Sequence, residues 1–81
     1  MSGYDELVRG IADEIERYLA RHPEAADSVE GISGWWLSSQ HGKDAVLAAL
    51  VQLEARGIVV RMERQGVATI FSSALRGRST D

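Results

Sequence analysis

Few residues of this 81-residue chain have the types and spacing that a reactive site requires. Ser38, Ser39 and His41 lie close together, but a serine nucleophile also needs a third group to orient the histidine and donors for an oxyanion. The sequence offers neither. His22 and His41 are the two histidines and there is no cysteine, so a metal site is not expected. We therefore expect no catalytic residue, no metal and no cofactor, and a protein that is not an enzyme.

Charge is distributed unevenly along the chain. Residues 1–31 hold eight acids and three bases, whereas residues 32–81 hold four acids and six bases. The net charge of −3 opposes non-specific attraction to a polyanion. The difference between the halves has two interpretations: a chance difference between charged surfaces, or a second half that faces an anionic partner.

The sequence also bears on location. No apolar run approaches the roughly 18 residues that a membrane-spanning helix needs. The first residues, MSGYDELVRG, are acidic and polar, unlike a secretory signal. With no cysteine available for disulfides, these features predict a cytoplasmic protein that does not bind a membrane.

The first element that must position any site is a helix over residues 4–21. Its apolar side chains recur at three- and four-residue spacing, which is typical of an amphipathic helix. These are Leu7, Val8, Ile11, Ile15, Tyr18 and Leu19. Pro23 disfavours helical geometry at His22 and therefore ends the helix.

A second, shorter helix is expected over about residues 29–37. Asp27 and Ser28 are suitable residues for its N-cap. Gly31 and Gly34 weaken it by roughly 1 kcal/mol each relative to alanine. We interpret these glycines as positions where another helix packs closely.

A third helix is expected over residues 45–56, after a polar loop at residues 38–42. Asp44 is the expected cap, and Gly57 follows the helix where a left-handed C-terminal glycine is common. The core stripe comprises Val46, Ala49, Leu50 and Leu53.

Two β-rich runs follow, at residues 58–62 and 67–71. Gln65 and Gly66 between them predict a hairpin turn, although Glu63 and Arg64 can also belong to the loop. Beyond Ala74 the chain is polar, and we expect a disordered tail over residues 75–81.

This order of elements resembles the winged helix-turn-helix domains of small bacterial MarR-like regulators. The local match is VLAALVQLEARGIVVRMERQG, Val46–Gly66, which is similar to their third helix and wing. The resemblance implies an α+β, mainly α fold: a three-helix winged helix-turn-helix with a C-terminal two-stranded β-hairpin wing. It further implies one domain over residues 1–81, with an ordered core at about residues 4–74.

The resemblance also implies a function. Such domains place the third helix in the major groove of double-stranded DNA and the wing on adjacent phosphates. Carried over by position, the DNA-binding residues are Lys43, Gln52, Arg56, Arg61 and Arg64. Since one small module with few bases binds weakly, we expect a transcription regulator that acts as a homodimer. In the other interpretation, Arg61, Glu63 and Arg64 form a solvated edge of the wing and do not contact phosphates.

Two adjacent tryptophans support an alternative. Neighbouring helix positions point about 100° apart, so Trp35 and Trp36 are not expected to enter the same core. In one interpretation Trp36 fills the core and Trp35 covers the rim of the first helix. In the other, Trp35, Leu47 and Val51 form an exposed apolar patch. The alternative function is a winged-helix protein-interaction module, an adaptor or accessory subunit that does not bind DNA.

Overall fold

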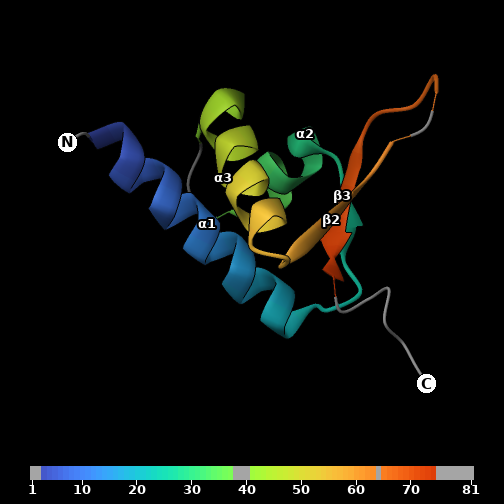
Figure 1. Ribbon diagram of the computed structural model, residues 1–81, viewed down its shortest axis with the longest axis horizontal. Coiled ribbons are helices and arrows are strands. Elements are labelled where there is room, and N and C mark those ends of the chain that lie inside the picture. Colours follow the sequence, from blue (N-terminus) through green and yellow to red (C-terminus); the bar gives the residue numbers. More distant parts are fainter. Residues whose placement is uncertain (1–2, 38–40, 64, 75–81) are drawn as a thin grey trace.

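The computed structural model describes residues 3–37, 41–63 and 65–74. Its elements are, in chain order, α1 (Gly3–Arg21), β1 (Ala26–Asp27), α2 (Val29–Gly31), the π-helix η1 (Ile32–Trp36), α3 (Lys43–Ala55), β2 (Val59–Met62) and β3 (Ile70–Ser73). Figure 1 shows α3 crossing α1, with the sheet beside the helices and the hairpin pointing away from them. The fold is therefore α+β and mainly helical, as predicted. The polar loop at 38–40, Arg64 and the tail at 75–81 lie outside the described residues.

The helix α1 forms close to its predicted limits because one stripe of it is apolar. Val8, Ile11, Ala12, Ile15 and Leu19 are buried, which confirms most of the expected stripe. Leu7 differs from the prediction, since this side chain is exposed near the start of the helix. Beyond Arg21, the peptide N–H of His22 still donates to the Tyr18 carbonyl at 2.8 Å before the chain turns.

The predicted second helix is divided into α2 and η1. Ser28 caps it, because its Oγ accepts the Gly31 N–H at 3.2 Å. Asp27 is not the cap: it belongs to β1, and its carboxylate accepts the Ser28 N–H at 2.8 Å.

The expected close approach of another helix is not found at either glycine of this segment. A Cβ on Gly31 would overlap the Asp27 carboxylate, whereas a Cβ on Gly34 would meet nothing within 4 Å. Space at Gly31 is therefore taken by a local side chain.

The helix α3 begins at Lys43, earlier than predicted, and its N-cap residue is Gly42, with no side-chain cap. Asp44 lies in the first turn, so the prediction that it caps the helix is wrong. Gly57 has a φ of 78°, as predicted for a C-terminal glycine.

The end of α3 is a Schellman motif. The Ile58 N–H donates to the Leu53 carbonyl at 2.9 Å and the Gly57 N–H to the Glu54 carbonyl at 3.0 Å. This closure turns the chain directly into β2.

The sheet has three antiparallel strands in the order β1-β3-β2, so the prediction of a two-stranded hairpin is incomplete. Ala26 pairs with Ser72 and Asp27 with Phe71, which adds β1 to the hairpin. The sequence does not predict β1, because alanine and aspartate have low strand propensity and pair here through tertiary contact.

The last strand is shifted from its predicted limits. β3 pairs with β2 from Met62 opposite Ile70 to Val59 opposite Ser73. Residues 67–69 therefore belong to the hairpin loop, whose Gly66 has a φ of 82°. Valine favours strands mainly where its side chain is half-buried on a pleated sheet. Val67 is exposed, so this preference does not place it in the strand.

One hydrophobic core joins the helices and the sheet. The expected α3 residues Val46, Ala49, Leu50 and Leu53 are all buried in it, together with Val59 and Phe71 from the strands. Trp36 is 8% exposed, which confirms its predicted place in the core. Its ring stacks on Tyr18 with centroids 4.6 Å apart.

Candidate interaction surface

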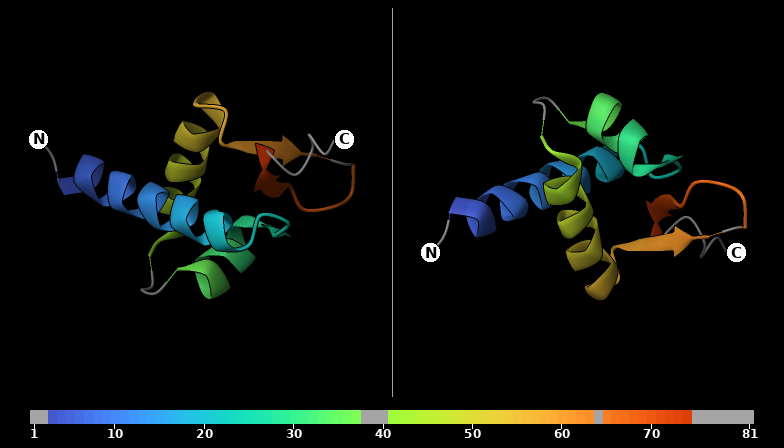
Figure 2. Two further views of the ribbon diagram at one scale, coloured as in Figure 1. Left: turned by 90° about the horizontal axis from the view of Figure 1, so that it is seen from below. Right: turned by 90° about the horizontal axis from the view of Figure 1, so that it is seen from above.

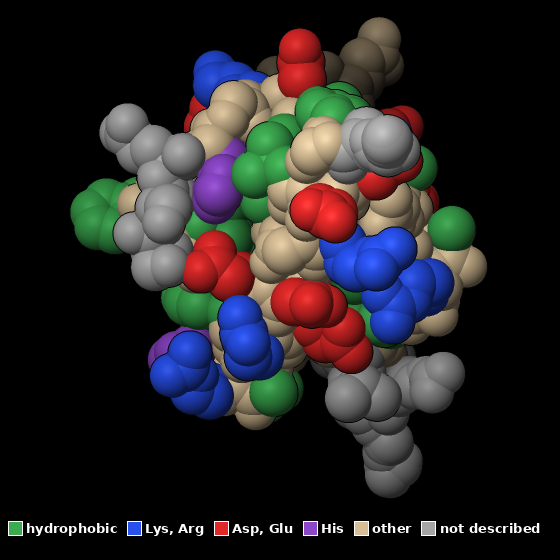
Figure 3. Space-filling view, turned by 90° about the vertical axis from the view of Figure 1, so that its left-hand side faces the viewer, with side chains coloured by type: hydrophobic (Ala, Val, Ile, Leu, Met, Phe, Trp, Pro, Cys, Tyr) green, Lys and Arg blue, Asp and Glu red, His purple; other side chains and the backbone are tan. Residues whose placement is uncertain are grey.

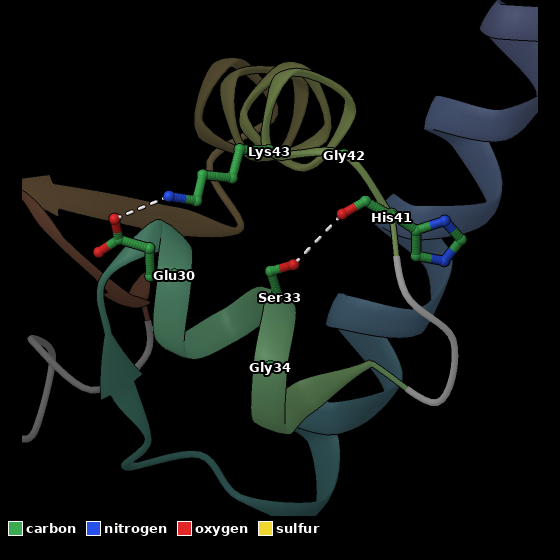
Figure 4. A pocket seen from close by; sticks show the side chains of 6 residues that line it. All are labelled: Glu30, Ser33, Gly34, His41, Gly42 and Lys43. Atoms are coloured by element: carbon green, nitrogen blue, oxygen red, sulfur yellow. Dashed lines mark hydrogen bonds and ion pairs between the residues drawn. The ribbon is translucent and has the colours of Figure 1, made fainter.

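The first predicted DNA-binding residue, Lys43, is engaged in an ion pair. Its Nζ lies 2.9 Å from Oε2 of Glu30, so the first residue of α3 is tied to α2. Figure 4 shows the two side chains reaching toward each other across the space between these helices. Both are well exposed, so the pair contributes little to stability, but the carboxylate offsets the lysine charge locally.

A polar surface cavity of about 470 Å³ lies beside this pair. Its lining comprises Glu30, Ser33, Gly34, His41, Gly42 and Lys43. The Ser33 hydroxyl donates to the His41 carbonyl at 3.4 Å, while the His41 imidazole points away from the cavity (Figure 4). Ser33 and the His41 ring therefore do not form a nucleophile–base pair.

The positive charge of Arg61, in β2, is compensated by two carboxylates, whereas that of Lys43 is compensated by one. Its guanidinium lies 2.9 Å from the Glu54 carboxylate and 3.4 Å from that of Glu63. It also lies over the Phe71 ring, 5.3 Å from the centroid. The hydrogen bond to Glu54 raises the pKa of Arg61 above its usual value, because it stabilises the charged form. Arg61 thus holds the end of α3 against β2 and β3.

Three further residues were predicted to contact DNA. Gln52 and Arg56 are exposed, and Arg56 is the C-cap of α3. Lys43, at the opposite end of this 13-residue helix, is about 20 Å away along the axis. Arg64 lies outside the described residues. Among the described residues, Gln52 and Arg56 therefore lie one turn apart, whereas Lys43 is at the far end of the helix.

The three residues of the alternative prediction are all exposed. Trp35 is 81% exposed, so the interpretation that it covers the rim of the first helix is wrong. Leu47 and Val51 are 41% and 46% exposed. Their four-residue spacing places both on one face of α3, and we call this pair the α3 face. Trp35 lies on η1, which packs against α3.

A second apolar surface, on the hairpin, was not expected from the sequence. Val60 and Met62 of β2 are 41% and 45% exposed, and Val67 in the loop is exposed as well. A shallow cavity is lined by Met62, Val67, Ala68 and Ile70. The alternation of side chains along a strand could have indicated this surface. If Val59 faces the core, Val60 and Met62 both lie on the opposite face.

One face of the molecule shows how the charged side chains are distributed. On the face drawn in Figure 3, acidic and basic side chains lie side by side, with hydrophobic side chains between them. Among the described residues, no group of three or more potential ligand side chains could hold a metal ion. In the same part of the chain, no helix is both long and apolar enough to cross a membrane.

Comparisons with known proteins add no further constraint. The chain matches no protein-family model, no curated protein and no solved structure.

Proposed function

We propose that this protein is a winged-helix domain that binds a protein partner through the α3 face, with Trp35 as a further contact. The winged-helix part of the proposal is supported by the order of three helical segments followed by a hairpin. The Schellman closure supports it too, because it leads the chain from the last helix directly into the hairpin that would be the wing.

One observation carries the choice of a protein partner: two apolar side chains in the middle of α3, Leu47 and Val51, are exposed, while Lys43 and Arg61 are paired with carboxylates. A helix that binds DNA needs free basic and polar side chains for phosphates and base edges. On α3 the exposed Leu47 and Val51 offer neither, and Lys43 and Arg61 already contact carboxylates. Each cation would have to exchange a carboxylate for a phosphate, which lowers its net contribution to affinity.

The exposed tryptophan fits the same proposal. Interface hot spots are enriched in tryptophan, tyrosine and arginine, and interface centres are depleted of charge. Trp35 is the large aromatic side chain that the π-helix leaves outside while it turns Trp36 into the core. An aromatic residue held outward on a helix is a suitable anchor for a partner.

Matched charge substitutions on α3 test the proposal. Leu47→Glu and Val51→Glu place a carboxylate on the α3 face, and Gln52→Glu places one at an exposed, already polar neighbour. We expect a partner captured from the native lysate and then purified to bind the wild type and Gln52→Glu alike. Binding to Leu47→Glu or Val51→Glu should be weaker by about tenfold or more. Equal binding by all four proteins would contradict the proposal.

DNA binding is the second candidate, favoured by Gln52 and Arg56, which are both exposed on or beside α3. Among the described residues, the Arg56 guanidinium forms no ion pair. Fluorescence polarisation with mixed double-stranded fragments distinguishes the candidates. If affinity falls steeply as salt rises and Arg56→Ala weakens binding while Leu47→Glu does not, the protein is a DNA-binding protein and the proposal of a protein partner fails.

A further inference from the structure

We propose that the free edge of β2 pairs in antiparallel fashion with β2 of a second copy of this chain, with Arg61 opposite Glu63 of that copy. The residues involved are other than Leu47 and Val51, so this inference does not rest on the proposed function.

The strand order leaves β2 at an edge of the sheet. Within the described residues β2 pairs with β3 alone, and β1 lies on the far side of β3. Figure 2 shows the hairpin extending beyond the helices, so its strands are not enclosed by them. An edge strand presents unpaired N–H and C=O groups to which another strand can add.

Successive residues of β2 direct their backbone N–H and C=O groups alternately toward β3 and away from it. The Ala74 N–H donates to the Ile58 carbonyl at 2.9 Å, so Ile58 faces β3. In an antiparallel ladder the direction alternates along the strand. Val60 and Met62 therefore also bond to β3, opposite Ser72 and Ile70. The backbone groups of Val59, Arg61 and, by extension, Glu63 point away from β3.

The side chains favour one register of that pairing. Charged residues usually protect an edge from pairing, but Arg61 and Glu63 have opposite signs and stand two positions apart. Pairing Arg61 with Arg61 would oppose like charges, and pairing it with Val59 would leave both charges without a complement. Pairing Arg61 with Glu63 places opposite charges together at two symmetry-related positions, which stabilises cross-strand pairs.

The contacts within one chain allow this exchange. Arg61 is held mainly by Glu54 at 2.9 Å, and its contact with its own Glu63 is longer, at 3.4 Å. Glu63 of a second copy can replace the longer contact while Glu54 remains in place.

Apolar side chains on the outer face of the sheet support the same register. The strand alternation puts Val60, Met62 and Ile70 on the face opposite to the buried Val59 and Phe71. Pairing Arg61 with Glu63 sets Met62 opposite Met62 of the second copy, so two exposed apolar strips become one. The contact is short, and interfaces below about 1,200 Å² are typical of transient complexes. We therefore expect a weak dimer whose population rises with concentration.

A charge exchange tests the register. In a dimer of Arg61→Glu, two carboxylates would face each other at both symmetry-related positions, and in a dimer of Glu63→Arg, two guanidinium groups would. We expect each variant alone to dimerise about tenfold more weakly than the wild type by sedimentation velocity. Mixing the two variants should restore the dimer, because both contacts then pair opposite charges. A wild type that stays monomeric at every concentration, or a mixture that stays monomeric, would overturn the proposal.

Amide hydrogen exchange on the wild type provides a readout without any substitution. The amides of Val60 and Met62 should be protected at all concentrations, since they bond to β3. Those of Arg61 and Glu63 should become protected only as concentration rises. Concentration-independent exchange at Arg61 and Glu63 would overturn the proposal even if a charge variant failed to fold.

Discussion

At the scale of single residues, two adjacent tryptophans differ in their exposure to solvent. Trp35 and Trp36 are consecutive, yet the first is 81% exposed and the second is 8% exposed and stacked on Tyr18. Residue type alone cannot distinguish them, because both are equally hydrophobic. The π-helix that carries them decides which ring points inward.

We expect the two tryptophans to differ sharply in their contribution to stability. Trp36→Ala removes a buried ring and should lower the free energy of unfolding by about 3–5 kcal/mol. Trp35→Ala should change it by less than about 0.5 kcal/mol, since surface substitutions away from special features have small effects. Urea denaturation followed by circular dichroism measures both. Similar losses for the two variants would show that Trp35 is buried in solution.

At the scale of elements, the glycines differ in what surrounds them. Gly10 lies within α1, where a Cβ would meet nothing within 4 Å, whereas a Cβ on Gly31 would overlap the Asp27 carboxylate. That carboxylate accepts the Ser28 N–H, so displacing it also disturbs the start of α2. Helix propensity favours replacing glycine by alanine at both positions. The local contact decides whether the replacement raises or lowers stability.

We expect Gly10→Ala to stabilise the protein by about 0.5–1 kcal/mol, because alanine loses less backbone entropy in a helix. Gly31→Ala should destabilise it despite the same propensity gain, because the methyl group displaces Asp27. Thermal unfolding measures both effects: the melting temperature should rise for Gly10→Ala and fall for Gly31→Ala. Stabilisation by both substitutions would mean that Asp27 moves aside without cost.

At the scale of the whole molecule, the sheet and the helices share one core. Phe71 of β3 and Val59 of β2 are buried with the inner residues of α1 and α3. Arg61 joins α3, β2 and β3 at the surface through Glu54 and the Phe71 ring. The hairpin is therefore not expected to unfold independently of the helices.

We expect Phe71→Ala to lower the free energy of unfolding of the whole molecule by about 3–5 kcal/mol. Because the core is shared, helix content by circular dichroism and Trp36 burial by fluorescence should be lost in one coincident transition. A variant that keeps its helical transition and loses only the hairpin would contradict a single core.

The sequence by itself determined the approximate positions of the long helices, the Gly57 turn, and an N-cap at either Asp27 or Ser28. Each depends on neighbours within a few residues: an apolar spacing, a hydroxyl before a helix, a residue that tolerates positive φ. The inner face of α3 followed for the same reason. The candidate surface was predictable in part, since Leu47 and Val51 lie outside that core stripe.

Tertiary structure decided the rest. β1 forms because Asp27 pairs with Phe71, which is distant in the sequence. β3 begins at Ile70, which pairs with Met62 of β2. The compensation of Lys43 by Glu30 and of Arg61 by Glu54 likewise joins residues from different elements. Sequence patterns report the preferences of a segment, whereas strand pairing and charge pairing depend on which segments the folded core brings into contact.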